Sequence, residues 1–307
     1  MILLVIVGLV WSSGVRATPR TVVTIKPIHS LVAAVMAGIG QPRLLVTGAA
    51  SPHGHALKPS QARALAAAEL VVWVGPEMES FLIKPAVSLL ATTTVLTLIT
   101  EPEVIKLRAR RGGAWQGHEA DEDHQGASDE HTEGRHDIDA HFWLDPENGR
   151  AIVALVADRL AGLDPANAAA YWANAVRVTR ELQALEQEIA GRLAALRHVP
   201  YVVFHDAYQY FEARFRTNAV GSISISPDRP PSARRLRDIR RRIKTSGAVC
   251  VFAEPQFKPR LVDTVREGTA ARAATLDPLG AAIEAGPDAY AALLRDLALA
   301  IASCLES

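Results

Sequence analysis

Four histidines of this 307-residue sequence follow segments with strand-like hydrophobicity. His29 comes after the run 21–25, His53 lies in a turn-rich SPHGH stretch, His141 opens HFWLDP, and His205 directly follows YVVF. In open parallel sheets, ligands bind beyond the carboxyl ends of the strands. We therefore expect the last three histidines to converge in one cleft, where three imidazoles suit zinc better than manganese, which prefers carboxylate oxygen. A single histidine in such a place is more often a satisfied hydrogen-bonding residue, so the prediction depends on the set of three.

More histidines lie in the polar stretch 118–141, which carries five histidines, nine carboxylates and one arginine. A stretch of this composition cannot form a hydrophobic core, so we expect a solvated loop over residues 108–139. Imidazole and carboxylate groups together bind divalent metals, and an acidic linker that only aids solubility is the alternative interpretation. The candidate metal ligands in this loop are His118, His124, His131 and His136.

Composition restricts the classes of partner. The 33 acidic and 33 basic residues give a formal net charge of zero, which does not suggest a nucleic acid or an anionic membrane. The basic run from Ala233 to Lys244 invites a nucleic-acid interpretation. However, Leu236, Ile239 and Ile243 fall on one helical face, so we expect a solvated helix with its arginines on the opposite face.

Residues 1–17 have the features of a secretory signal peptide. Their apolar run of about ten residues is too short to span a bilayer and is followed by small and polar residues up to Ala17. No lysine or arginine precedes the run, so a buried first strand is the alternative. No cysteine follows it, which argues against a lipid anchor, and no later segment is long enough to cross a membrane. We expect export to a bacterial periplasm as a soluble protein that begins near Thr18.

The sequence contains two cysteines, Cys250 and Cys304. An even number in an exported chain suggests one disulfide, which would stabilise the fold by about 4 kcal/mol for a loop of this length. Two buried free thiols are the alternative.

Strand and helix patterns alternate along most of the chain, as is typical of parallel sheets covered by helices. Residues 18–164 form the expected first lobe and residues 198–307 the second. Between them, residues 165–197 have no proline after Pro165 and carry apolar residues at helical spacing. The expected fold is therefore α/β, with two Rossmann-like lobes of parallel sheet joined by a long rigid α-helix. The expected strands are 21–25, 44–47, 70–74, 93–98, 201–204, 219–222, 248–252 and 273–276.

Seven stretches carry a family resemblance and follow one another in order across essentially the whole mature chain. They are TIKPIHSLVAAVM (24–36), SPHGHALKPSQ (51–61), AAELVVWVGPEMESF (67–81), HFWLDP (141–146), YVVFHDAYQYFE (201–212), CVFAEPQF (250–257) and TLDPLG (275–280). With these stretches the sequence resembles the ZnuA type of metal solute-binding protein, the periplasmic zinc-binding component of bacterial ABC zinc uptake transporters.

The resemblance implies that zinc is held between the lobes by His53, His141 and His205. Asp277 of TLDPLG occupies a position that can supply a fourth oxygen ligand. Some relatives have a carboxylate just before the first ligand, but Pro52 stands there, so the fourth ligand is Asp277 or water.

Two further expectations come from the same resemblance. In manganese-binding relatives a glutamate typically occupies the position of His205, so this histidine favours zinc. The resemblance also supports pairing Cys250 with Cys304.

The expected function is capture of zinc and its delivery to an ABC transporter permease that works with a cytoplasmic ATPase. We expect a monomer that is not an enzyme and has no nucleic-acid partner. The loop is expected either to raise the local zinc concentration and pass metal to the cleft, or to hold a weaker second ion.

Two rival functions deserve comparison. A zinc hydrolase needs a general base beside the metal, yet the sequence has no HExxH motif. Glu254 is the nearest candidate base, and a structural hydrogen bond is the better interpretation of it. A manganese-binding or adhesin relative is the other rival, and the absence of a lipobox together with the His/acid-rich loop counts against it.

Overall fold

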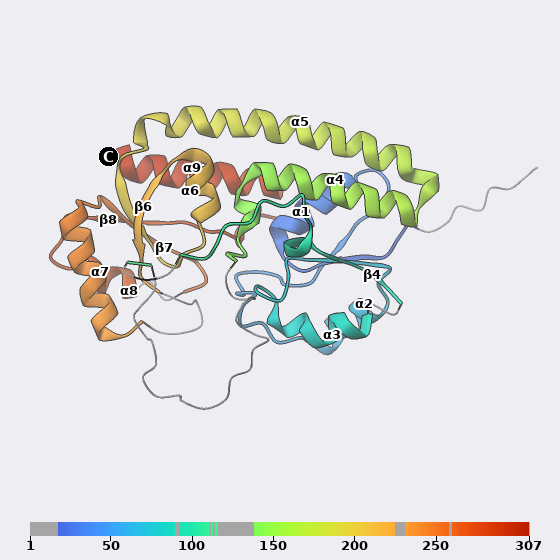
Figure 1. Ribbon diagram of the computed structural model, residues 1–307, viewed down its shortest axis with the longest axis horizontal. Coiled ribbons are helices and arrows are strands. Elements are labelled where there is room, and N and C mark those ends of the chain that lie inside the picture. The colour runs from blue at the N-terminus through green and yellow to red at the C-terminus, as the bar shows by residue number, and fades with distance from the viewer. Residues whose placement is uncertain are drawn as a thin grey trace, which may run out of the picture.

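The computed structural model describes residues 18–89, 92–110, 112, 114–115, 138–224, 231–257 and 260–306 (Figure 1). The predicted signal peptide, residues 1–17, lies outside the described residues. His118, His124, His131 and His136 lie outside them as well. No helix within the described ranges is long and apolar enough to cross a membrane.

Within the described residues, the first lobe is built on a four-stranded parallel sheet in the order β2-β1-β3-β4. Strand β3 reads Leu-Val-Val-Trp and is buried along its whole length, because helices cover both faces of such a sheet. The strands are β1 (Thr21–Val23), β2 (Arg43–Leu44), β3 (Leu70–Trp73) and β4 (Thr94–Thr97). The helices of this lobe are α1 (Lys26–Val35), α2 (Pro59–Ala66), α3 (Ile83–Leu89) and α4 (Pro146–Leu163).

The second lobe repeats this topology. Its described strands form a four-stranded parallel sheet in the order β6-β5-β7-β8, so the second strand along the chain again lies at the edge beside the first. The strands are β5 (Pro200–Val203), β6 (Asn218–Ser222), β7 (Cys250–Ala253) and β8 (Arg272–Thr275). The helices are α6 (Gln209–Phe215), α7 (Ala233–Ser246) and α8 (Arg260–Arg266). The predicted α/β class with two lobes of parallel sheet is confirmed.

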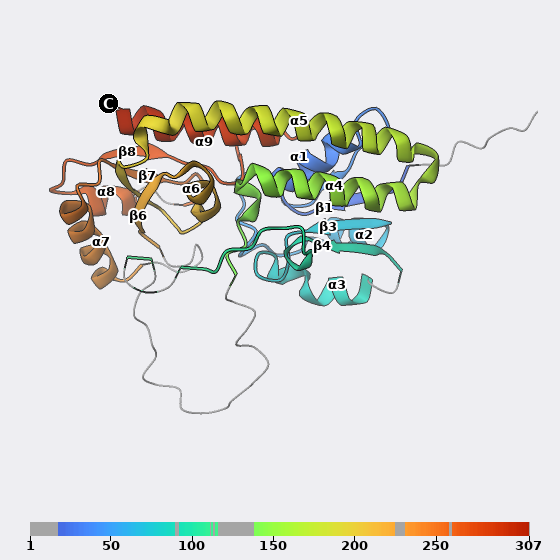
Figure 2. The same cartoon turned by 45° about the horizontal axis from the view of Figure 1, so that its top comes forward.

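Helix α5 (Ala168–Leu193) lies along both lobes, and helix α9 (Ala289–Glu306) runs beside it over the second lobe (Figure 2). Helix α5 has 26 residues and is about 39 Å long at 1.5 Å per residue. Helix α9 packs against α5 and also against α1 of the first lobe. The C-terminal helix, which follows the second sheet in sequence, therefore joins the first lobe through its apolar face.

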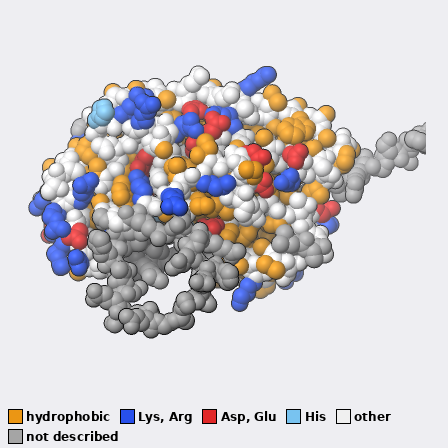
Figure 3. Space-filling model, viewed as in Figure 1, with side chains coloured by type: hydrophobic (Ala, Val, Ile, Leu, Met, Phe, Trp, Pro, Cys, Tyr) orange, Lys and Arg blue, Asp and Glu red, His pale blue; other side chains and the backbone are white. Residues whose placement is uncertain are grey.

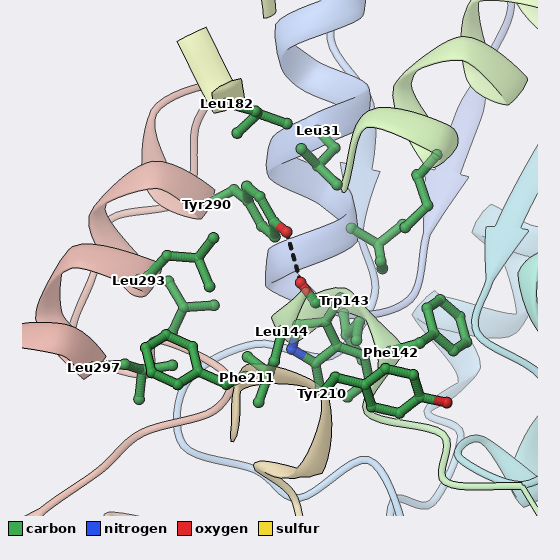
Figure 4. Packing of buried hydrophobic residues seen from close by; sticks show 14 of the residues in the cluster. Leu31, Phe142, Trp143, Leu144, Leu182, Tyr210, Phe211, Tyr290, Leu293 and Leu297 are labelled. Atoms are coloured by element: carbon green, nitrogen blue, oxygen red, sulfur yellow. Dashed lines mark hydrogen bonds between the residues drawn. The ribbon is translucent and has the colours of Figure 1, made fainter. Parts of the chain in front are cut away.

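The contact between the lobes is a hydrophobic core to which both contribute (Figure 4). Its centre holds Trp143 from the segment before α4 and Tyr290 from α9, both fully buried. The Tyr290 hydroxyl donates a hydrogen bond of 2.6 Å to the carbonyl of Trp143. Gly149 in α4 makes room for this ring, because a Cβ atom there would lie 2.7 Å from the Tyr290 oxygen. Helix α9 is thereby fixed against the start of α4.

The basic helix α7 differs from expectation at one residue. Ile239 and Ile243 are buried, as predicted, and lysine and arginine side chains gather on the surface over α7 (Figure 3). Arg235, however, is buried, and its guanidinium donates hydrogen bonds to the carbonyls of Ser222 and Ala114. The prediction that all the arginines face solvent is wrong here, because this one ties the end of β6 to the beginning of the His/acid-rich loop.

A disulfide joins Cys250 of β7 to Cys304 of α9 over a sequence separation of 54 residues. The predicted pairing is confirmed. The bond links the second sheet covalently to the helix that packs on the first lobe.

Replacing both cysteines by alanine should lower the free energy of unfolding by about 4 kcal/mol, because the unfolded chain regains the freedom of this loop. Urea denaturation with and without a reductant measures this effect. The variant should be insensitive to reductant, whereas the wild-type protein should lose stability on reduction. Equal stability of variant and wild type would contradict the prediction.

Glu79, between β3 and α3, is fully buried and accepts hydrogen bonds from the Thr24 hydroxyl and from the N–H groups of Val74 and Gly75. Burial raises its pKa to about 7, although the three hydrogen bonds oppose the shift. A carboxyl whose pKa is raised on folding stabilises the protein most below its unfolded pKa and loses this contribution as the pH rises through about 7.

The free energy of unfolding should therefore fall between pH 5 and pH 8 by roughly 1 to 3 kcal/mol more in the wild type than in Glu79→Gln. Urea denaturation at several pH values tests this difference. Glu69→Gln, which changes an exposed carboxylate of the same lobe, should keep the wild-type pH dependence. A Glu79→Gln curve parallel to that of the wild type would refute the prediction.

Candidate metal centre

Three connecting segments supply the predicted ligands. His53 lies between β2 and α2, and His205 comes two residues after β5. His141 immediately precedes the short 3-10 helix Phe142–Leu144. Among the described residues just before it, Ile138 forms an isolated antiparallel bridge with Arg108 and is not part of a strand. The structure thus places His205 beyond the carboxyl end of a parallel strand, as expected, and brings His141 to it by the entry into α4.

The three histidines converge. One nitrogen from each of His53, His141 and His205 lies within 4.8 Å of the other two. The ring centroids of His141 and His205 are 5.2 Å apart, and that of His53 lies 5.6 Å and 6.4 Å from them. His141 and His205 are buried, whereas His53 is partly exposed. This spacing suits one small cation with His53 on its solvent side.

A carboxylate from its own lobe fixes each buried ring. Asp139 accepts hydrogen bonds from the Nδ1 and the backbone N–H of His141, at 2.7 and 3.0 Å. Glu254, which follows β7, accepts from the Nδ1 and the backbone N–H of His205, at 2.7 and 3.3 Å. With both Nδ1 atoms engaged, the two Nε2 atoms face each other at 3.3 Å. Histidines that bind metals are held in this way, with the second ring nitrogen donating to a carboxylate.

Burial keeps two of the rings neutral. It lowers the pKa of His53 and of His141, and the charge of His205 lowers both further. At His205 burial also acts to lower the pKa, but the charge and the hydrogen bond of Glu254 outweigh it and raise the pKa. Burial raises the pKa of Asp139 to about 7. A cation between the imidazoles would stabilise the charged form of Asp139, which is otherwise costly to bury.

Two cavities meet at the histidines. A small one of about 20 Å³ is lined by all three rings and by apolar groups such as Met78 and Leu279. This volume accommodates little more than a single ion or water molecule. The other, of about 130 Å³, is lined mostly by polar and charged residues and contacts His53 and His141 from the side of the His/acid-rich loop. Its remaining lining residues are Glu77, Ala109, Arg110, Trp115, Asp139, Ala140 and Asp206.

Arg110 organises the polar cavity. Its guanidinium donates hydrogen bonds to Asp206 and Glu212 and lies 3.4 Å from the ring centroid of Trp115. Asp206 is the residue after His205, so Arg110, near the beginning of the His/acid-rich loop, is attached to the second lobe directly beside the metal centre.

Asp277, the predicted fourth ligand, does not belong to the group of three histidines. Its carboxylate accepts hydrogen bonds from the side chain of Gln256 and from the N–H groups of Leu279, Gly280 and Ala281. These four donors already occupy its oxygens, which counts against a role as a metal ligand. Its assignment as a ligand stays a prediction.

Sequence reasoning overlooked Asp139 as a partner of His141, although it lies only two residues away. For Glu254 the expected structural hydrogen bond is present. Its partner was not predictable from spacing, because His205 lies 49 residues away along the chain. The parallel pairing of β5 with β7 brings the two together.

The profile of the family described as zinc-uptake complex component A, periplasmic (ZnuA), matches residues 21–304. The chain belongs to this family. It is 43% identical over 320 residues to the high-affinity zinc uptake system protein ZnuA of Brucella suis, covering 97% of this chain and 95% of the relative. Its identity to the protein of the same name from Yersinia pestis is 37% over 298 residues, covering 94% and 92%.

Solved structures share the fold. A crystal structure of ZnuA superposes with a TM-score of 0.76 at 24% identity, covering 94% of this chain and 99% of the other. The periplasmic zinc binding protein TroA from Treponema pallidum superposes with a TM-score of 0.78 at 19% identity, with the same coverage. The two-lobed architecture described above is therefore shared with these two proteins.

The carboxylate that holds His205 should control zinc affinity. Glu254→Gln removes its charge at nearly constant volume and should weaken zinc binding about 10- to 100-fold, as is usual for such partners of metal-binding histidines. A competition titration with a zinc-chelating dye measures the dissociation constant. Glu103→Gln, an exposed carboxylate of the first lobe, is the control. Zinc affinity within twofold of the wild type in Glu254→Gln would refute the role of Glu254.

Proposed function

We propose that the protein captures zinc in the periplasm with His53, His141 and His205 and delivers it to the permease of an ABC-type zinc uptake system. The observation that carries this proposal is the pair of opposed Nε2 atoms, 3.3 Å apart and each presented by a ring that a carboxylate holds. Two imidazole nitrogens that bind one tetrahedral zinc ion at about 2.0–2.1 Å lie about 3.3–3.4 Å from each other, so the arrangement suits a bound zinc ion.

The donor set supports zinc as the cargo. Three imidazole nitrogens suit zinc, whereas manganese favours more oxygen ligands. Such a site would also bind copper, so selectivity depends partly on which metal is available. The relatives in Brucella and Yersinia are named as high-affinity zinc uptake proteins. We assign the fourth coordination position to water or to Asp277.

The carboxylates nearest the histidines favour a carrier over a zinc hydrolase. A hydrolase needs a free general base beside the metal. Glu254 is engaged with His205, and Asp139 is engaged with His141. The family is one of transport-binding proteins, which agrees with a protein that is not an enzyme.

Further parts of the proposal concern the whole chain. Residues 1–17 serve as a signal peptide that is removed on export, residues 18–164 and 198–307 act as two lobes, and residues 165–197 join them. The mature protein works as a monomer with a membrane permease, which a cytoplasmic ATPase drives.

The ends of the His/acid-rich loop support a role in supplying zinc. The carbonyl of Ala114 accepts hydrogen bonds from the N–H of Ser222 and from Arg235, while Asp139 at the other end holds His141. Trp115 and Asp139 also line the same cavity beside His53 and His141, so both described ends of the loop lie next to the metal centre. Ions held by His118, His124, His131 or His136 would therefore stay near the cleft, either as a local supply or as a weaker second site.

Zinc competition titration of the mature protein tests the ligand assignment. His205→Ala should lose the tight site, whereas deletion of residues 117–137 should keep it. The deletion stops before Ile138, because Asp139 is needed to orient His141. His198→Ala, which removes an exposed histidine of the second lobe, is the matched control. If His205→Ala keeps the tight site and the deletion abolishes it, the loop and not the cleft carries the zinc.

A further inference from the structure

The chain returns from the second sheet to α9 through residues 276–288, which we call the crossing segment. Pro278 and Leu279 of this segment line the small metal cavity. Further along, the carbonyl of Pro287 accepts a hydrogen bond from Ser30 of α1, which places this end of the segment on the first lobe. The crossing segment therefore belongs to the metal site at one end and to the contact between the lobes at the other.

Lys26, the first residue of α1, binds the middle of the crossing segment. Its ammonium donates hydrogen bonds to the carbonyls of Gly280 at 2.5 Å, Ala281 at 3.0 Å and Ile283 at 2.7 Å. An ammonium group has three N–H donors, so this single segment uses all of them. The residue is only 9% exposed, and such charge-assisted bonds are stronger where water is excluded.

Asp277, near the start of the crossing segment, shapes the turn from within. Its carboxylate gathers the N–H groups of Leu279, Gly280 and Ala281, and Gly280 adopts a φ of +65°, which suits glycine. The turn thus directs N–H groups to its own carboxylate, Asp277, and carbonyl groups to Lys26 of the first lobe.

Trp143 adds a third attachment. Its indole N–H donates to the carbonyl of Pro278 at 2.9 Å, and its ring lies 5.3 Å from that of His141 between centroids. Movement of the crossing segment would therefore shift Trp143 and, through it, the ring of His141.

We propose that Lys26 is a positioning residue for zinc: by holding the crossing segment on the first lobe, it keeps the metal site closed and slows zinc release. The same geometry assigns Asp277 to building the turn that Lys26 grips. This inference rests on the proposed function, because it concerns retention of zinc at the three histidines. Release to the permease then requires the three bonds of Lys26 to break as the lobes separate.

Lys26→Met removes the three donors at similar side-chain length, and Lys26→Gln is a second variant in case the first does not fold. Zinc dissociation, followed by stopped-flow mixing with excess chelator, should be about tenfold faster in either variant, since charge-assisted hydrogen bonds are lost. The association rate should change little. Lys26→Arg should restore slow release in part, and Lys84→Met, at an exposed lysine of α3, should behave as the wild type.

Hydrogen–deuterium exchange of residues 276–288 provides a readout that is independent of zinc. In the zinc-free protein, exchange should be faster in Lys26→Met and Lys26→Gln than in the wild type. Unchanged zinc dissociation in variants that melt at a lower temperature would overturn the inference and leave Lys26 with a purely structural role. A failure of the proposed function would be recognised separately. In that case the His205→Ala variant, with Lys26 unchanged, would still bind zinc tightly.

Discussion

The structure depends on two imidazole rings from different lobes meeting with their Nε2 atoms 3.3 Å apart. Neither lobe can make this contact alone, since His141 leads into α4 and His205 leaves β5. Each ring is oriented within its own lobe by a carboxylate, so the distance between the nitrogens reports the position of one lobe relative to the other. Small changes in that position alter the site strongly, because metal–nitrogen bonds tolerate little variation in length.

The architecture holds this position through several contacts of different kinds. Helices α5 and α9 and the buried Tyr290 and Trp143 form an apolar connection, which resists separation of the lobes without fixing fine detail. The hydrogen bonds of Tyr290 and Trp143 add direction to it. Apolar burial thus supplies most of the stabilisation, while a few buried polar groups select one arrangement.

Much of this fold could be predicted from the sequence, because parallel strands buried on both faces appear as continuous apolar runs. The runs at β3 and β7 are clear examples. The segment between β3 and α3 is less evident from the sequence. A turn at Gly75 leads into the buried Glu79, and a 3-10 turn, Ser80–Leu82, precedes α3, which therefore begins only at Ile83. A glutamate is ordinarily taken as exposed, so nothing in its local sequence revealed this role.

The site shows a similar division. The three histidines were identified from their types and their places between predicted elements. The carboxylate partners were not, because the partner of His205 depends on β5 lying beside β7, which is a property of strand order. Asp139 could not be distinguished by sequence from the other acidic residues of the loop. Arg235 resembled its solvent-facing neighbours in α7, and only the tertiary structure shows the carbonyls that it binds.

Helix α9 follows both sheets in the sequence, which has a consequence for the order of folding during synthesis. Each sheet is formed by segments that follow one another closely, so either lobe can begin to assemble as soon as its strands have emerged. The core between the lobes can form only after Tyr290 and the residues that follow it have been synthesised, and the disulfide only after Cys304. Alignment of His141 with His205 is therefore a late event in the maturation of the protein, completed only when its last helix has docked.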